Sequence, residues 1–209
     1  MSRKTKPWPS PRPIPTGVSF GTYHEALFRA VREFLADVKR AEREAHEEVE
    51  NIRKKLGIPA VYQPDIHVER YSMAVQVLVA MTMEGAIDMY GVVKFGEEAA
   101  RKTWKWFHNK GPGGKLQEMI KAAKGIDLDD DAEILQIVKK VFKARNAFVH
   151  PKSDETVFDD AGNPLRVRTE HLFPGQDGNH ARAAYEDLSR FLRLLHDIDP
   201  DVGVFIYPW

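Results

Sequence analysis

The stretch KARNAFVHPK, residues 143–152, carries three side chains that could act together on a phosphodiester: Arg145, Asn146 and His150. A guanidinium can hold two phosphate oxygens, and an imidazole can exchange a proton near neutral pH. RNA supplies its own nucleophile, the 2′-hydroxyl. An enzyme that cuts RNA therefore needs only proton transfer and stabilisation of the extra negative charge in the transition state. The arginine and the histidine together predict phosphodiester chemistry without a metal.

The spacing of this pair is common in the chain. An arginine and a histidine separated by four to six residues occur five times: Arg40 with His46, Arg101 with His108, Arg145 with His150, Arg166 with His171, and Arg190 with His196. Only the third copy has an asparagine directly after the arginine. It also closes a predicted helix, and its histidine precedes Pro151, where the chain leaves the helix and the ring becomes exposed.

Arg145, Asn146, three further residues and His150 form an R-N-x-x-x-H pattern. This pattern resembles the signature of HEPN domains, small all-helical proteins, many of which are metal-independent RNases in toxin-antitoxin, CRISPR and phage-defence systems. The resemblance implies that Arg145 and His150 belong to the active site. It also implies a homodimer in which the histidines and arginines of two chains meet in a composite site, and an antitoxin or defence-system partner.

Glu84 is a second candidate, because it interrupts a segment that is apolar nearly all round. An isolated buried charge costs several kcal/mol, so a buried Glu84 needs a partner, and Arg145 is one candidate. The resemblance implies that Glu84 orients Arg145. Asp88, one turn further along, is the competing position. A salt bridge to another basic residue, or a solvent-facing edge of the helix, would explain Glu84 equally well.

Basic residues near the motif could hold an RNA backbone. They are Lys140, Lys143 and Lys152, with Arg166 and Arg168 alternating on one face of a predicted β-hairpin. A local basic surface can bind phosphates although the chain has 31 basic and 31 acidic residues and no net charge. Ordinary surface charges, and a basic helix end that suits the helix dipole, are the plain alternatives.

Other chemistries have little support in the sequence. The chain has no cysteine, which excludes disulfides and thiolate ligands and favours a reducing, cytoplasmic location. No spacing of histidines and carboxylates matches a metal site, and we expect neither a metal nor a cofactor. The glycine-rich GPGGK, residues 111–115, lacks the spacing of a phosphate-binding loop and is interpreted as a linker between helices. No membrane segment and no secretory signal are predicted.

The elements that must position these residues are mostly helices. Residues 1–16 carry five prolines and four basic residues, which predicts a disordered basic arm. Residues 17–209 are expected to form one helical domain with its core at about 66–197. Apolar periodicity predicts helices over 22–57, 67–95, 97–108, 115–124, 130–150 and 179–196. Between residues 152 and 178, two short extended runs around DDAGNP favour a small β-hairpin.

The sequence therefore predicts an all-α, HEPN-like protein that cleaves RNA without metal, in toxin-antitoxin or phage-defence biology. The alternative is an inactive HEPN-like module that binds RNA, a nucleotide or a protein through the same basic surface.

Overall fold

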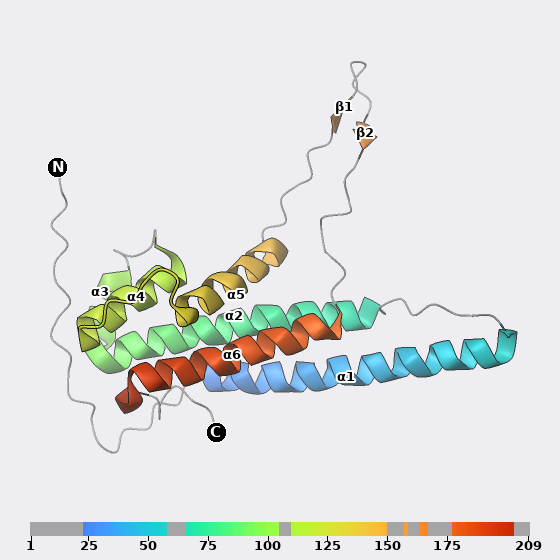
Figure 1. Cartoon of the computed structure of the whole chain (residues 1–209), viewed down its shortest axis with the longest axis horizontal. Coiled ribbons are helices and arrows are strands. Elements are labelled where there is room, and N and C mark those ends of the chain that lie inside the picture. Colours follow the sequence, from blue (N-terminus) through green and yellow to red (C-terminus); the bar gives the residue numbers. More distant parts are fainter. Residues whose placement is uncertain are drawn as a thin grey trace.

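A computed structural model describes residues 23–57, 66–104, 110–149, 157–158, 164–166 and 177–202 of the chain. The described residues form α1 (Tyr23–Leu56), α2 (Ile66–Phe95), α3 (Glu97–Trp104), α4 (Gly111–Lys124), α5 (Glu133–Val149), β1 (Val157–Phe158), β2 (Pro164–Arg166) and α6 (Gly178–Ile198) (Figure 1). The all-α class predicted from the sequence is confirmed. The predicted basic arm over residues 1–16 lies outside the described residues.

Helix α2 is the centre of the packing, since α1, α3, α4, α5 and α6 all contact it. Figure 1 shows α1, α2 and α6 lying lengthwise beside one another. Val75, Val79 and Met83 of α2 are completely buried, and each such side chain contributes about 1.5–3 kcal/mol by leaving water. The many neighbours explain why this helix is apolar nearly all round, and its predicted bounds agree with the structure to within one residue.

Helix α1 buries one stripe and extends beyond the other helices. Val31, Val38 and Ala41 face the core, whereas Ile52 and Leu56 near the end of the helix are exposed. Figure 1 shows this end of α1 reaching past the start of α2. The helix stops where the sequence predicted, because Gly57 adopts a φ of 64° that favours glycine.

The start of α4 differs from the prediction. GPGG was expected to be a linker, but α4 begins at Gly111, and Pro112 occupies its first turn. Proline suits this position because the first N–H groups of a helix have no intrahelical acceptor. At Gly114 a Cβ atom would lie 2.8 Å from Cβ of Lys110. Glycine therefore lets the first turn of α4 form against the residue that precedes it.

Helix α6 packs against both α2 and α5. Its core face repeats at helical spacing through Leu188, Phe191, Leu192 and Leu195, all of which are buried. At the outer edge, Nε and Nη2 of Arg190 each lie 2.8 Å from a carboxylate oxygen of Glu133, at the first residue of α5. These contacts fix α6 against the helix that carries Arg145.

The strands β1 and β2 pair antiparallel, with Val157 opposite Arg166 and Phe158 opposite Pro164. They lie in the segment where the sequence favours a β-hairpin. Residues 159–163, which would form its turn, lie outside the described residues, so the complete hairpin stays a prediction.

Candidate functional site

The last turns of α5 carry the arginine and the asparagine of the predicted motif. Val138, Val141 and Phe142 form the buried face of this helix, which holds it against the core. Helix α5 extends to Val149, and the next residue of the sequence, His150, lies outside the described residues. Arg145 therefore lies one turn before the last described residue of the helix.

Arg145 and Asn146 contact each other on the surface of α5. Nη1 of Arg145 donates a hydrogen bond to Oδ1 of Asn146 at 3.1 Å. Asn146 is exposed and Arg145 is half-buried. In the part of the chain that the structure describes, the other guanidinium donors of Arg145 have no partner. A planar cation with unused donors, oriented by a neighbouring amide, can accept an anion such as a phosphate.

The structure distinguishes Arg145 from two of the four other arginines that precede a histidine at similar spacing. Arg190 is bound on two sides by Glu133, and Arg40 forms an ion pair with Asp37 one turn away on α1. The side chains of Arg101 and Arg166 lie outside the described residues. Among the described arginines of the five pairs, only Arg145 has no carboxylate partner, which leaves its charge available for a ligand.

Of the alternatives that the sequence left open for Glu84, the solvent-facing edge is the correct one. Its side chain is exposed, and within the described residues no ion pair joins it to Arg145. Asp88, the competing position, is half-buried, and its Oδ1 lies 2.6 Å from Nζ of Lys115 on α4. Within the described residues, neither Glu84 nor Asp88 therefore contacts Arg145, and an orienting role for Glu84 stays a prediction.

The predicted substrate-binding lysines fall into different environments. Lys143 is exposed. Lys140 is also exposed, but its Nζ lies 2.7 Å from Oδ2 of Asp187 on α6, so part of its charge is neutralised. Lys152, Arg168 and the side chain of Arg166 lie outside the described residues, and the broad basic surface stays a prediction.

A pocket that the sequence did not predict opens beside the motif, between α2, α5 and α6. Its volume is about 170 Å³. Its apolar walls are the side chains of Val141, Ala144, Ala183 and Ala184. Gln76, Lys140, His180 and Asp187 complete its lining. Ala144 directly precedes Arg145, so the pocket and the motif share the same stretch of α5.

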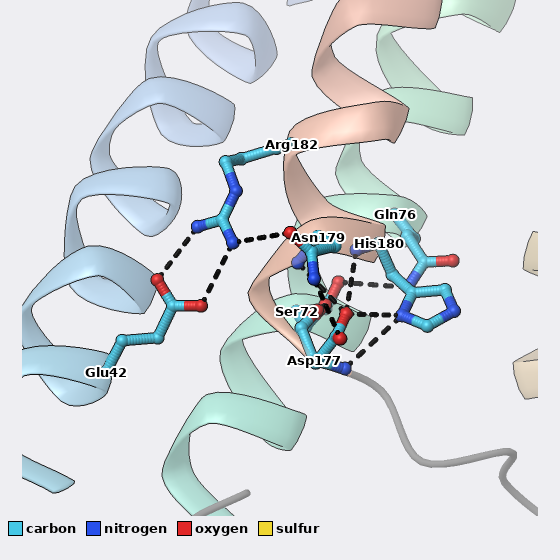
Figure 2. Close-up of polar contacts among 7 residues, drawn as sticks. All are labelled: Glu42, Ser72, Gln76, Asp177, Asn179, His180 and Arg182. Atoms are coloured by element: carbon cyan, nitrogen blue, oxygen red, sulfur yellow. Dashed lines mark hydrogen bonds and ion pairs between the residues drawn. The ribbon is translucent and has the colours of Figure 1, made fainter. Parts of the chain in front are cut away.

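His180 is held at the pocket by the first turn of α6. Asp177 is the N-cap of this helix, and its Oδ1 accepts hydrogen bonds from the backbone N–H groups of Asn179 and His180 at 3.0 and 3.2 Å. Nδ1 of His180 lies 2.8 Å from the same oxygen and 3.3 Å from the backbone nitrogen of Asp177. Figure 2 shows that the edge of the ring that carries Nε2 points away from Asp177. Asp177 thus orients the imidazole and leaves its outer nitrogen available.

This capping turn is anchored on both sides (Figure 2). Ser72 Oγ on α2 donates to the backbone oxygen of Asp177 at 2.7 Å. On the other side, Nη1 and Nη2 of Arg182 lie 2.8 and 3.2 Å from the carboxylate oxygens of Glu42 on α1. The start of α6, and with it His180, is therefore fixed to both α1 and α2.

The charge of Asp177 is stabilised by this arrangement. Partial burial alone would raise its pKa, but the hydrogen bonds from Asn179 and His180 outweigh burial and hold the pKa below the ordinary value of 3.8. Asp177 is therefore ionised at neutral pH. A signal for this turn was present in the sequence, because aspartate is a favoured residue at the position that caps the start of a helix.

Within the described ranges, no group of three or more histidine, aspartate or glutamate side chains is arranged to hold a metal ion. None of the helices in those ranges combines the length and hydrophobicity needed to cross a bilayer.

No protein-family model matches the sequence, and comparisons with curated proteins and with solved structures likewise give no match.

Proposed function

We propose that this protein is a metal-independent endoribonuclease of the HEPN type, acting in the cytoplasm in toxin-antitoxin or phage-defence biology. The observation that carries the proposal is the placement of Arg145. Its guanidinium stands near the end of α5, is contacted by Asn146, and has no carboxylate partner among the described residues. The motif histidine follows directly after this helix.

In the proposed reaction, the 2′-oxygen of a ribose attacks the adjacent phosphorus, and the bond from phosphorus to the 5′-oxygen breaks. His150 takes part in the proton transfer from the 2′-hydroxyl or to the departing 5′-oxygen. Arg145 holds the phosphate and stabilises the negative charge that builds up in the transition state. The products are a 2′,3′-cyclic phosphate and a 5′-hydroxyl end. DNA is not cut, because it lacks the nucleophile.

The resemblance to HEPN domains favours a homodimer in which two motifs face each other across a two-fold axis. In such a dimer, each of two equivalent sites takes Arg145 from one chain and His150 from the other. We therefore propose composite sites between two copies of the chain.

The test is incubation of purified protein with single-stranded RNA in EDTA. Wild type should cleave, and Arg145→Ala and His150→Ala should each lose nearly all activity. Asn146→Ala should fall between them and wild type, because the guanidinium loses its orienting contact. The matched control is the double variant Arg40→Ala, His46→Ala, which removes a similarly spaced pair from α1 and should cleave like wild type. Equal cleavage by all the variants would refute the site.

A binding module without catalysis is the second candidate. Glu84, the carboxylate expected to orient Arg145, is exposed and does not contact it, and an amide holds the guanidinium instead. A site made of Arg145 and Asn146 could bind a phosphate group without cleaving the RNA. RNA that is retained by wild type, released by Arg145→Ala and never cleaved would favour this function.

A further inference from the structure

The pocket between α2, α5 and α6 lies next to the proposed phosphate position. Val141 lines the pocket, and Arg145 stands one turn further along the same helix, a rise of about 5–6 Å. The inference drawn here rests on the proposed function, since it takes Arg145 as the group that holds an RNA phosphate. A nucleotide whose phosphate is held by Arg145 has its base within reach of the pocket.

The size of the pocket suits a ligand as small as a single nucleobase. Its volume of about 170 Å³ is well below the roughly 300–1,000 Å³ of pockets for drug-sized ligands. Three of its four apolar wall residues are alanines, Ala144, Ala183 and Ala184, so the space exists because these side chains are short. RNA is read mainly through unstacked bases inserted into such sites and hydrogen-bonded along their edges.

Lys140 and Asp187, which both line the pocket, form an ion pair with each other. Their ion pair, with Nζ 2.7 Å from Oδ2, presents an ammonium donor beside a carboxylate that can accept two hydrogen bonds. Guanine has the complementary edge, because its N1–H and N2–H groups donate side by side next to the accepting O6. Adenine, cytosine and uracil offer at most one ring N–H or amino group in place of these two donors.

We infer that this pocket binds a guanine base of the RNA whose phosphate is held at Arg145, with Asp187 and Lys140 reading the base edge. His180 supplies a further hydrogen bond from Nε2, and the capping contacts with Asp177 keep its ring in place. The protein therefore cleaves single-stranded RNA next to guanine.

The test measures nucleoside binding, which does not depend on cleavage. Guanosine, adenosine, cytidine and uridine are each titrated into the full chain, while NMR follows the ring signals of His180, assigned with His180→Gln. Guanosine should shift these signals and bind about tenfold or more tightly than the others, as expected for a bidentate contact to a base. Asp187→Asn, which preserves size, should remove the preference for guanosine.

The second part of the test fills the pocket with a larger side chain. Ala183→Leu places a larger side chain in the pocket wall and should abolish binding, whereas Ala36→Leu at an exposed position of α1 should bind guanosine like wild type. Equal affinity for all four nucleosides, or unchanged guanosine binding in both Asp187→Asn and Ala183→Leu, would overturn the inference.

The pocket and the proposed function can fail separately. Replacing guanosine with guanosine 3′-monophosphate should strengthen binding in wild type but not in Arg145→Ala. If guanosine binds and the phosphate adds nothing, the pocket stands and the role of Arg145 falls. If no nucleoside binds while RNA is still cleaved in EDTA, the guanine pocket is refuted and the nuclease is retained.

Discussion

Tyr90 on α2 donates a hydrogen bond to Oδ2 of Asp199 at 3.1 Å, and both side chains are completely buried. Nζ of Lys94 lies 2.9 Å from the same carboxylate oxygen, and Nζ of Lys124 lies 3.5 Å from Oδ1. In the described part of the chain, Oδ1 accepts no hydrogen bond of normal geometry. This cluster ties the end of α6 to α2 and α4, far along the chain from the capping turn at Asp177.

Removal of this carboxylate should destabilise the fold strongly. Among the described residues, Asp199→Ala leaves the buried ammonium of Lys94 with one carboxylate partner, Asp201, which is 3.6 Å away and largely exposed. Breaking a buried ion pair on one side costs about 3–5 kcal/mol of unfolding free energy. Urea denaturation monitored by circular dichroism measures the loss, and Asp201→Ala is the control with an expected cost of about 1 kcal/mol or less. Similar midpoints for both variants would contradict a structural role for Asp199.

Tyr90 should make stability sensitive to alkaline pH. Burial and the neighbouring Asp199 raise the pKa of its phenol far above the ordinary value of 10.0. In the unfolded chain the phenol ionises from about pH 10, whereas in the folded protein it stays neutral. The contribution of Tyr90 is therefore fully present below pH 10 and declines as the pH rises further. Urea titrations of wild type and Tyr90→Phe at pH 8 and above should show their stability difference shifting toward Tyr90→Phe above pH 10. A constant difference would contradict this linkage.

The helices that predominate in this fold were predictable because each has a local cause. Apolar residues repeat along α1 until Gly57 stops it, and the apolar run of α2 marks a helix surrounded by neighbours. The start of α4 was missed because glycine and proline usually interrupt helices, whereas here Pro112 fits the first turn and Gly114 allows a close backbone approach.

The sequence predicted where the site residues lie along the chain, but not which residues surround them in space. Sequence spacing placed Arg145 and Asn146 near the end of α5, but it could not show which narrow strip of α2 its neighbours leave uncovered. Glu84 lies on that strip, which periodicity alone does not reveal. The pocket forms where three helices from distant segments of the chain come together. The ion pair between Lys140 and Asp187 joins two of these helices, and no local sequence pattern predicts such a contact.

Gly178 should be required for the contact between α6 and α1. A Cβ atom at this position would clash with the carboxylate of Glu42, which binds Arg182. Gly178→Ala should therefore push Glu42 aside and cost about 1 kcal/mol, the typical upper value for a partly exposed ion pair. In a Glu42→Ala background the same substitution should be neutral or slightly stabilising, because alanine restricts the unfolded chain. Thermal unfolding of the four proteins in this cycle measures the coupling, and equal effects in both backgrounds would argue against the clash.

Mixing two inactive variants distinguishes a composite site between two chains from a site within one chain. Arg145→Ala and His150→Ala should each be inactive alone, yet a mixture of the two should regain activity after subunit exchange. In such a heterodimer, one site receives Arg145 from one chain and His150 from the other, and the second site lacks both. With equal amounts and random pairing, half of the dimers carry one intact site of two, so RNA cleavage should recover to about a quarter of the wild-type rate. Cleavage in EDTA, measured before and after mixing, checks this value.

The control mixture pairs Arg145→Ala with the double variant Arg145→Ala, His150→Ala. This mixture contains no intact Arg145 and should stay inactive. If the first mixture also stays inactive although size-exclusion chromatography and native mass spectrometry show heterodimers, the arginine and histidine must act from the same chain.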